Sequence, residues 1–327
     1  MHTFTHLKAA FRPLTFDPAL DITPAQARDY RAFYSLGGLP GHQHIGWLNH
    51  DGLRLATQYW LPQNTNIKTV RGTIVIAHGY YDHIGLYGHL LHYWLARDYA
   101  VIGMDMPGHG LSDGSPAAIG NFDEYGNSLA TLLQSAQAFL PQPWTGVGQS
   151  MGCAVLMNYL MRRSCINPFC RLIFFAPLLR PYHWAISGRW IYFLLHRFII
   201  SIPRRLSVNS GDADFVRFVS TQDPLQSRRL NVAWVGAMKN WLDHFAQQPV
   251  LNAPTLIIQG EQDNTVDWRY NIPHITQKLS QSEVHYLRRA HHHLVNESEV
   301  LRSRLWATVD RYCEHPDRRI PSRGDSD

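Results

Sequence analysis

Short runs of mostly apolar residues recur along most of the chain, and segments with helical periodicity separate most of them. The runs are residues 73–77, 100–104, 145–148, 172–175, 255–258 and 284–287. A strand that lacks a polar face is buried on both sides. Buried strands that alternate with helices predict an α/β fold, with a mostly parallel central sheet and helices on both of its faces.

The region before this alternation has a different pattern. Residues 44–60 alternate polar and apolar positions on either side of Asp51 and Gly52, which predicts two strands joined by a hairpin turn. Residues 1–40 are expected to form a loosely organised N-terminal arm. We expect one short helix in this arm, around residues 24–34.

A long segment interrupts the strand and helix alternation further along the chain. Residues 179–234 are rich in aromatic residues and arginine, and residues 178–211 contain no acid. We expect this segment to be a helical cap, or lid, inserted into a core made of residues 41–178 and 235–315. Residues 316–327 are polar and are expected to form a disordered tail.

Charge, cysteine spacing and the apolar segments argue against a nucleic-acid-binding, secreted or membrane-spanning protein. The chain of 327 residues has a net charge of +5, which permits contact with anionic surfaces but does not indicate nucleic-acid binding. Its four cysteines form no CxxC pair and are expected to be free thiols. The first fifteen residues lack a signal peptide's apolar region, and the most apolar stretch, residues 190–202, is too short to span a bilayer. We therefore expect a cytoplasmic protein that can still be peripheral on the inner face of the membrane.

Residues 148–152, Gly-Gln-Ser-Met-Gly, form a complete G-x-S-x-G pattern. The pattern places its serine on a sharp turn between a strand and a helix, and small residues two positions before and after let the turn close. A predicted strand precedes it and an apolar helix follows it. Ser150 is therefore the candidate nucleophile for acyl transfer.

The partners that a serine nucleophile requires occur at the ends of other predicted strands. Asp263 follows one strand as the candidate orienting acid, and three consecutive histidines, 291–293, follow the next. The backbone N–H groups of Tyr80 and Met151 are the expected oxyanion donors. Gly79 would let this loop approach the substrate carbonyl.

Several segments together resemble the α/β-hydrolase family, in the branch of monoacylglycerol lipases, lysophospholipases and serine aminopeptidase-like enzymes. The resemblance extends over about residues 45–315 and rests on these segments: Asp51 to Leu55, Tyr59 to Pro62, His78 and Gly79 with His83, Asp105 to Gly114, Phe122 to Tyr125, Gln149 to Gly152, and Asp223 to Leu225. It implies a triad of Ser150, Asp263 and His292. Two alternatives stay open, His291 for the base and Asp267 for the acid. Cys153 departs from the family pattern, because a third glycine is common there.

Other polar residues have structural or undecided roles. His109 and Ser112 are expected to belong to a structural turn, and His83 either lines the site or braces the oxyanion loop. The nineteen histidines include neither an H-x-H-x-D-H nor an H-E-x-x-H pattern, so no metal site and no cofactor are expected. Replacing His291 or His293 by alanine is expected to keep most activity.

The cap suggests the substrate class. It is apolar and bordered by arginines, and it offers Trp190, Phe193 and Leu194 as substrate-binding residues together with Gly79 and His83. We expect hydrolysis of carboxylic esters of single-chain lipids, namely lysophospholipids or monoacylglycerols. Two roles of the cap stay open: it contacts an anionic membrane, or it only roofs the pocket. The alternatives are an iminopeptidase-like serine aminopeptidase and a non-catalytic hydrolase scaffold.

Overall fold

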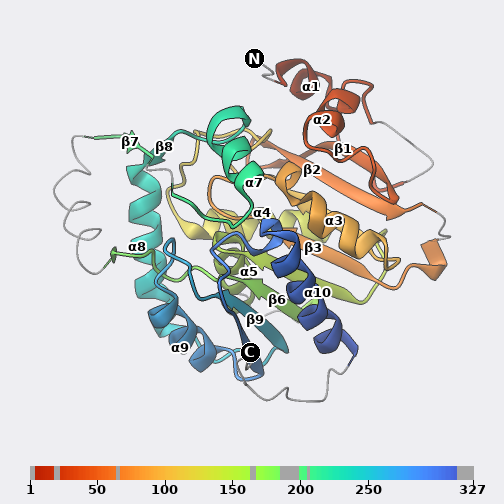
Figure 1. Cartoon of the computed structure of the whole chain (residues 1–327). Coiled ribbons are helices and arrows are strands. Elements are labelled where there is room, and N and C mark those ends of the chain that lie inside the picture. The colour runs from red at the N-terminus through yellow and green to blue at the C-terminus, as the bar shows by residue number, and fades with distance from the viewer. Residues whose placement is uncertain are drawn as a thin grey trace.

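The computed structural model describes residues 4–17, 23–63, 67–162, 167–184, 199–204 and 207–314. Its centre is an eight-stranded sheet with the strand order β1-β2-β4-β3-β5-β6-β9-β10 (Figure 1). The strands are β1 (Gly41–His50), β2 (Leu53–Pro62), β3 (Thr73–Ala77), β4 (Ala100–Met104), β5 (Trp144–Gln149), β6 (Phe169–Phe175), β9 (Thr255–Gly260) and β10 (Ser282–Leu287). β2 pairs antiparallel with β1 and with β4, and the other pairs are parallel. The predicted α/β architecture is confirmed.

Local sequence explains the strand positions. β3, β4, β5 and β9 are buried along their whole length, as their apolar runs predict. The hairpin between β1 and β2 turns at Asp51, with φ 49°, and Gly52, with φ 80°. Two successive positive φ angles match the twist of the flanking strands, so this turn fixes the register of the predicted hairpin.

Helices cover both faces of the sheet. The helices are α1 (Thr5–Ala10), α2 (Ala27–Phe33), α3 (Gly88–Leu95), α4 (Phe122–Ala136), α5 (Met151–Arg162), α7 (Ala213–Arg217), α8 (Val232–Gln247), α9 (Trp268–Lys278) and α10 (Glu299–Glu314). Buried side chains of α4, α5, α8 and α9 form one apolar cluster, and those of α1, α2, α3 and α10 form a second. α3 and α10 lie in front of the sheet in the view of Figure 1.

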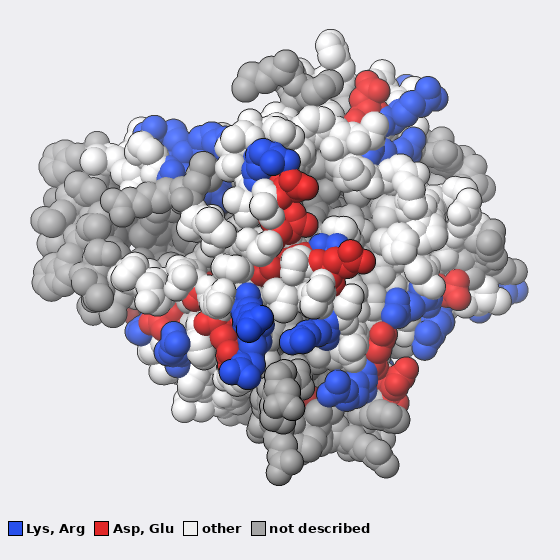
Figure 2. Space-filling view, in the orientation of Figure 1, with Lys and Arg blue, Asp and Glu red and all other residues white. Residues whose placement is uncertain are grey.

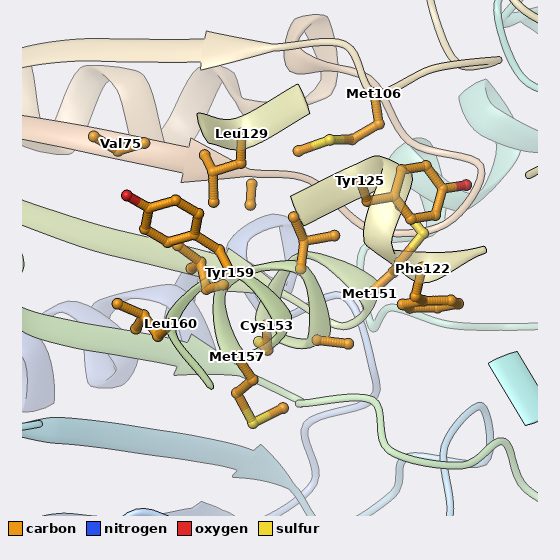
Figure 3. Close-up of a cluster of buried hydrophobic side chains, with 14 of the residues drawn as sticks. Val75, Met106, Phe122, Tyr125, Leu129, Met151, Cys153, Met157, Tyr159 and Leu160 are labelled. Carbon is orange, nitrogen blue, oxygen red and sulfur yellow. The ribbon is translucent and has the colours of Figure 1, made fainter. Parts of the chain in front are cut away.

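The first apolar cluster anchors the start of α5. Asn121 caps α4 and forms a capping box with Glu124. The side chain of Met151, the first residue of α5, lies in the cluster with Phe122 and Tyr125 (Figure 3). Burial of this side chain therefore fixes the backbone immediately after Ser150.

The N-terminal arm differs from the expectation of a loosely organised segment. Its described part contains α1 in addition to the expected helix, α2, and its apolar residues belong to the second core cluster. Tyr30 has no exposed surface, and Leu7 is 2% exposed. The arm is part of the folded core because its aromatic side chains bury apolar surface, and this burial stabilises the folded state.

The segment expected to form the cap is described only in part. A short antiparallel pair, β7 (Ser201–Pro203) and β8 (Arg229–Asn231), lies at the start of α8. The expected end of the cap at residue 234 falls inside α8, which begins at Val232. Among the described helices, none combines the length and the apolar composition needed to cross a bilayer.

Candidate active site

Ser150 lies on the turn that joins β5 to α5. Its φ of 54° is in the left-handed region, and such strain in a non-glycine residue is concentrated at functional sites. A Cβ on Gly152 would lie 1.9 Å from the carbonyl oxygen of Ala77, and one on Gly148 would lie 2.7 Å from the backbone nitrogen of Cys153. Both glycines are therefore required by close backbone packing, as the sequence pattern predicts.

Asp263 and His292 form a buried pair at the ends of β9 and β10. The Nδ1 atom of His292 lies 2.7 Å from Oδ2 of Asp263. The carboxylate also accepts hydrogen bonds from the Gln259 side chain and the backbone N–H groups of Thr265 and Val266. Burial opposes its ionisation, but His292 and the hydrogen bonds outweigh burial, so the pKa of Asp263 lies below its ordinary value. With Nδ1–H donated to Asp263, Nε2 of His292 is left to accept a proton.

The three consecutive histidines contact three different carboxylates. His292 pairs with Asp263, whereas Nδ1 of His291 lies 3.0 Å from Oε1 of Glu297. On the other side, Nε2 of His293 lies 3.0 Å from Oδ2 of Asp82. In this register only the middle histidine reaches Asp263, as the family resemblance predicts for the base.

The loop after β3 passes beside the nucleophile turn. His78 holds this loop in place: its Nδ1 lies 2.8 Å from the carbonyl oxygen of Gly79, and its Nε2 accepts the backbone N–H of Met106 at 2.8 Å. Burial lowers the pKa of His78 to about 3, so the ring is neutral and can make both contacts. Tyr80 follows, and its ring stacks on Trp234 of α8 at 3.8 Å between centroids. A Cβ on Gly79 would lie 3.6 Å from the carbonyl oxygen of Gln149, so the two expected oxyanion donors, Tyr80 and Met151, belong to adjacent backbone segments.

A second hydrogen-bonded chain connects this loop to the histidine run. The backbone N–H of Gly79 donates to the hydroxyl of Tyr87 at 3.0 Å, and that hydroxyl donates to Oδ2 of Asp82 at 2.9 Å. The same Oδ2 atom contacts His293. Gly79, which precedes the expected oxyanion donor Tyr80, is therefore connected to His293, which follows the expected base.

Ser150 and His292 line one cavity of about 570 Å³. Its wall includes the predicted residues Gly79 and Tyr80. Apolar side chains from the end of the first core segment, the described cap region and α8 also line it: Leu178, Trp184, Ile202, Leu230, Trp234, Val235 and Met238. The predicted substrate-binding residues Trp190, Phe193 and Leu194 lie outside the described residues.

His83 does not line this cavity, although the sequence left that role open. Its side chain has no exposed surface, and its Nε2 lies 3.1 Å from Oδ2 of Asp223. The hydroxyl of Tyr34 donates to the other oxygen of Asp223 at 2.7 Å. Although burial alone would lower it, Asp223 and two further acids raise the pKa of His83. This placement matches the alternative role, in which His83 braces the oxyanion loop.

Asp267, the alternative acid, and Ser112 make structural contacts. Asp267 forms an ion pair with Arg180 at 2.6 Å and caps α9. Ser112 accepts the backbone N–H of Ala56 and donates to the carbonyl oxygen of Asp105, which confirms the expected structural turn. Among the described residues, no group of three or more His, Cys, Asp or Glu side chains is arranged to hold a metal ion.

Sequence reasoning missed several residues that position this site. The side chain of Gln149 donates to the carbonyl oxygen of His292 at 2.9 Å, and the carbonyl oxygen of Asn209 accepts the backbone N–H groups of His292 and His293. Gln149 could have been recognised as a candidate because it lies inside the G-x-S-x-G pattern. Nothing in the local sequence marks Asn209.

Comparison with known proteins gives consistent matches. A family model described as serine aminopeptidase, S33, matches residues 68–299. A monoacylglycerol lipase of Mycolicibacterium smegmatis is 31% identical over 224 residues, which cover 66% of this chain and 77% of the relative. The phospholipase YtpA of Bacillus subtilis is 25% identical over 205 residues, which cover 59% of this chain and 76% of the relative.

Solved structures share the fold. A soluble variant of monoglyceride lipase from Saccharomyces cerevisiae, solved in complex with a substrate analog, matches with a TM-score of 0.71 and 17% identity. The match covers 82% of this chain and 94% of that chain. Because the family model spans more than half of the sequence and the sheet has the order described above, the chain belongs to the serine aminopeptidase S33 family of α/β-hydrolases, in the monoacylglycerol lipase branch.

Proposed function

We propose that this protein is a serine hydrolase that cleaves carboxylic esters of single-chain lipids, in the manner of a lysophospholipase or monoacylglycerol lipase. The observation that carries the proposal is the buried pair of His292 and Asp263, in which His292 lines the same cavity as Ser150. Membership of a hydrolase family with lipase relatives supports it.

The proposed reaction has two steps. In the first, Ser150 Oγ attacks the ester carbonyl carbon while Nε2 of His292 takes the hydroxyl proton. The carbon–oxygen bond to the alcohol then breaks, and His292 returns the proton to the leaving alcohol. In the second step, water attacks the acyl-enzyme with His292 as base, and the fatty acid and free Ser150 are released. The N–H groups of Tyr80 and Met151 would hold the oxyanion in both steps.

The cavity wall supports a lipid substrate. Its described apolar side chains can cover a hydrocarbon chain, and each buried methylene adds about 0.8 kcal/mol of binding. Trp190, Phe193 and Leu194 remain proposed substrate contacts. We also propose that the arginine-bordered cap makes peripheral contact with anionic membrane on the cytoplasmic side.

The aminopeptidase alternative requires a carboxylate to hold a free amine. Asp82 is the carboxylate that lines the described part of the cavity, and it already accepts hydrogen bonds from His293 and Tyr87. This occupancy favours the ester substrate.

A fluorophosphonate probe and an ester panel test the proposal. The wild type should be labelled, and Ser150→Ala should lose labelling and nearly all turnover. Long-chain monoacylglycerols and lysophospholipids should give a higher kcat/KM than acetyl esters or aminoacyl amides. Labelling of the Ser150→Ala protein would refute the nucleophile, and preference for aminoacyl amides would refute the lipid substrate. Sedimentation with anionic vesicles at low and high salt tests the membrane contact.

A further inference from the structure

Arg204 lines the cavity that contains Ser150. It follows β7, and its guanidinium lies 3.9 Å from the centroid of the Tyr81 ring. Its Nη1 donates to Oε1 of Gln226 at 2.8 Å. The sequence grouped Arg204 with the arginines around the cap, but the structure places it in the wall of the site.

No carboxylate forms an ion pair with Arg204 among the described residues. Asp82 does act on its charge, but it is already hydrogen bonded to His293 and Tyr87. Arg180 is different, because it forms an ion pair with Asp267. A partly buried cation whose direct side-chain contacts, Gln226 and Tyr81, are neutral is stabilised by an anion that joins it.

The surface around this part of the cavity is basic. In the region where Figure 1 places β7 and β8, the visible face shows Lys and Arg atoms and no Asp or Glu atoms (Figure 2). Residues 178–211 contain no acid, so the segment that carries Arg204 cannot neutralise it. An anionic ligand would therefore meet complementary charge.

Arg204 is also close to the expected reaction centre. The Tyr81 ring under its guanidinium is 4.1 Å from the Tyr80 ring, and Tyr80 is the expected oxyanion donor. Tyr81 has a φ of 71°, so the packing around it holds a strained backbone next to that donor. A group bound by Arg204 would lie in the same cavity as the scissile ester.

The cavity has a polar side and an apolar side. Ser207 and Asn209 line it on the segment that carries Arg204, and Oδ1 of Asn209 is buried with no hydrogen-bond partner among the described residues. Trp234 and Met238 of α8 line it with apolar side chains. A hydroxylated, charged headgroup fits the first side, and an acyl chain fits the second.

We propose that Arg204 binds the phosphate of an anionic headgroup, so that the substrate is a single-chain glycerophospholipid in which the phosphate lies on the glycerol. A planar guanidinium offers paired N–H donors that match phosphate oxygens. The Asn209 amide oxygen would accept the glycerol hydroxyl. This inference rests on the proposed function, because it names the substrate class of the same cavity.

The test compares two substrates that differ only in the phosphate, 1-decanoylglycerol and 1-decanoylglycerol 3-phosphate, each below its micelle concentration. The measured quantity is the ratio of kcat/KM for the phosphorylated ester to kcat/KM for the neutral ester. We expect this ratio to exceed one in the wild type. Arg204→Gln should lower it about 10- to 100-fold, the loss expected for one charge-assisted hydrogen bond, and Arg204→Lys should lower it less.

Arg229→Gln is the matched control. Arg229 is exposed on β8, donates to Ser201 of β7, and does not line the cavity. Arg229→Gln removes one positive charge from β8, which pairs with the strand that Arg204 follows, so the ratio should not change. Glycerol 3-phosphate should also inhibit wild-type hydrolysis of the neutral ester competitively, which tests the site without any variant.

A wild-type ratio of one or less, or an equal fall in Arg229→Gln, would overturn the inference. So would a lack of competition by glycerol 3-phosphate. If the wild type is labelled by the fluorophosphonate and hydrolyses p-nitrophenyl butyrate in these cases, only the phosphate site fails. If it does neither, the proposed function itself fails.

Discussion

His293 offers a test of how the oxyanion loop is positioned. In the structure it contacts Asp82, which accepts from Tyr87, and Tyr87 in turn accepts the backbone N–H of Gly79. Replacing His293 by alanine would leave the buried Asp82 with one side-chain donor fewer. A hydrogen bond to a charged group contributes about 1.5–3 kcal/mol.

That energy sets the expected effect on catalysis. Loss of an oxyanion donor costs about 10²- to 10³-fold in kcat, and His293→Ala displaces such a donor only indirectly. We therefore expect His293→Ala to lower kcat about 10- to 100-fold with a small change in KM. His292→Ala should lower kcat by at least about 10⁴-fold. This revises the expectation from sequence that His293→Ala keeps most activity.

His291, the first histidine of the run, provides the control. His291 contacts Glu297, which also accepts the backbone N–H groups of Gly211 and Ser298, so His291→Ala should keep kcat within about threefold. His293→Gln retains an N–H donor and should recover most of the lost kcat. The assay is steady-state hydrolysis of p-nitrophenyl butyrate with the rate of fluorophosphonate labelling. Equal kcat for the His291→Ala and His293→Ala proteins would refute the positioning role.

Three further predictions concern the acid, the arm and the nucleophile turn. Asp263→Asn should lower kcat about 10⁴-fold, whereas Asp267→Asn should lower only the melting temperature; the opposite pattern would move the acid role to Asp267. Burial opposes ionisation of Asp263, but His292 and the hydrogen bonds outweigh it and lower the pKa. Asp263 therefore contributes stability that is complete above its ordinary pKa of 3.8 and is lost as the pH falls through the lowered value, and urea titrations of wild type and Asp263→Asn from about pH 2 to 7 would measure this loss. Tyr34→Phe removes the hydrogen bond to Asp223 and should lower the free energy of unfolding by about 2 kcal/mol in urea titrations; no change would mean that the arm is not coupled to the core. Gly152→Ala would place a Cβ 1.9 Å from the backbone of β3 and should lower both the melting temperature and kcat, so wild-type values for both would contradict the close packing.

Local signals explain what could be predicted from the sequence. The strands and the turn at Ser150 follow from apolar runs and glycine spacing within a few residues of each other. The pairing of His292 with Asp263 follows from strand-end positions together with the family resemblance. The catalytic roles of these residues stay predictions.

Partners that are distant along the chain could not be predicted. Asp82 and His293 are 211 residues apart, and His83 and Asp223 are 140 residues apart. No periodicity or spacing connects such residues, because only the sheet order brings their loops together. The same reason explains why the place of Arg204 in the cavity wall was not predicted.

The arm also bears on how the chain reaches its native state during synthesis. Tyr34 and its partner Asp223 are 189 residues apart. At about 5–20 residues per second, the ribosome needs about 10 to 40 s to deliver the second residue after the first. Throughout that interval the arm's aromatic residues cannot complete their packing, so their apolar surface stays accessible to chaperones until Asp223 has been synthesised.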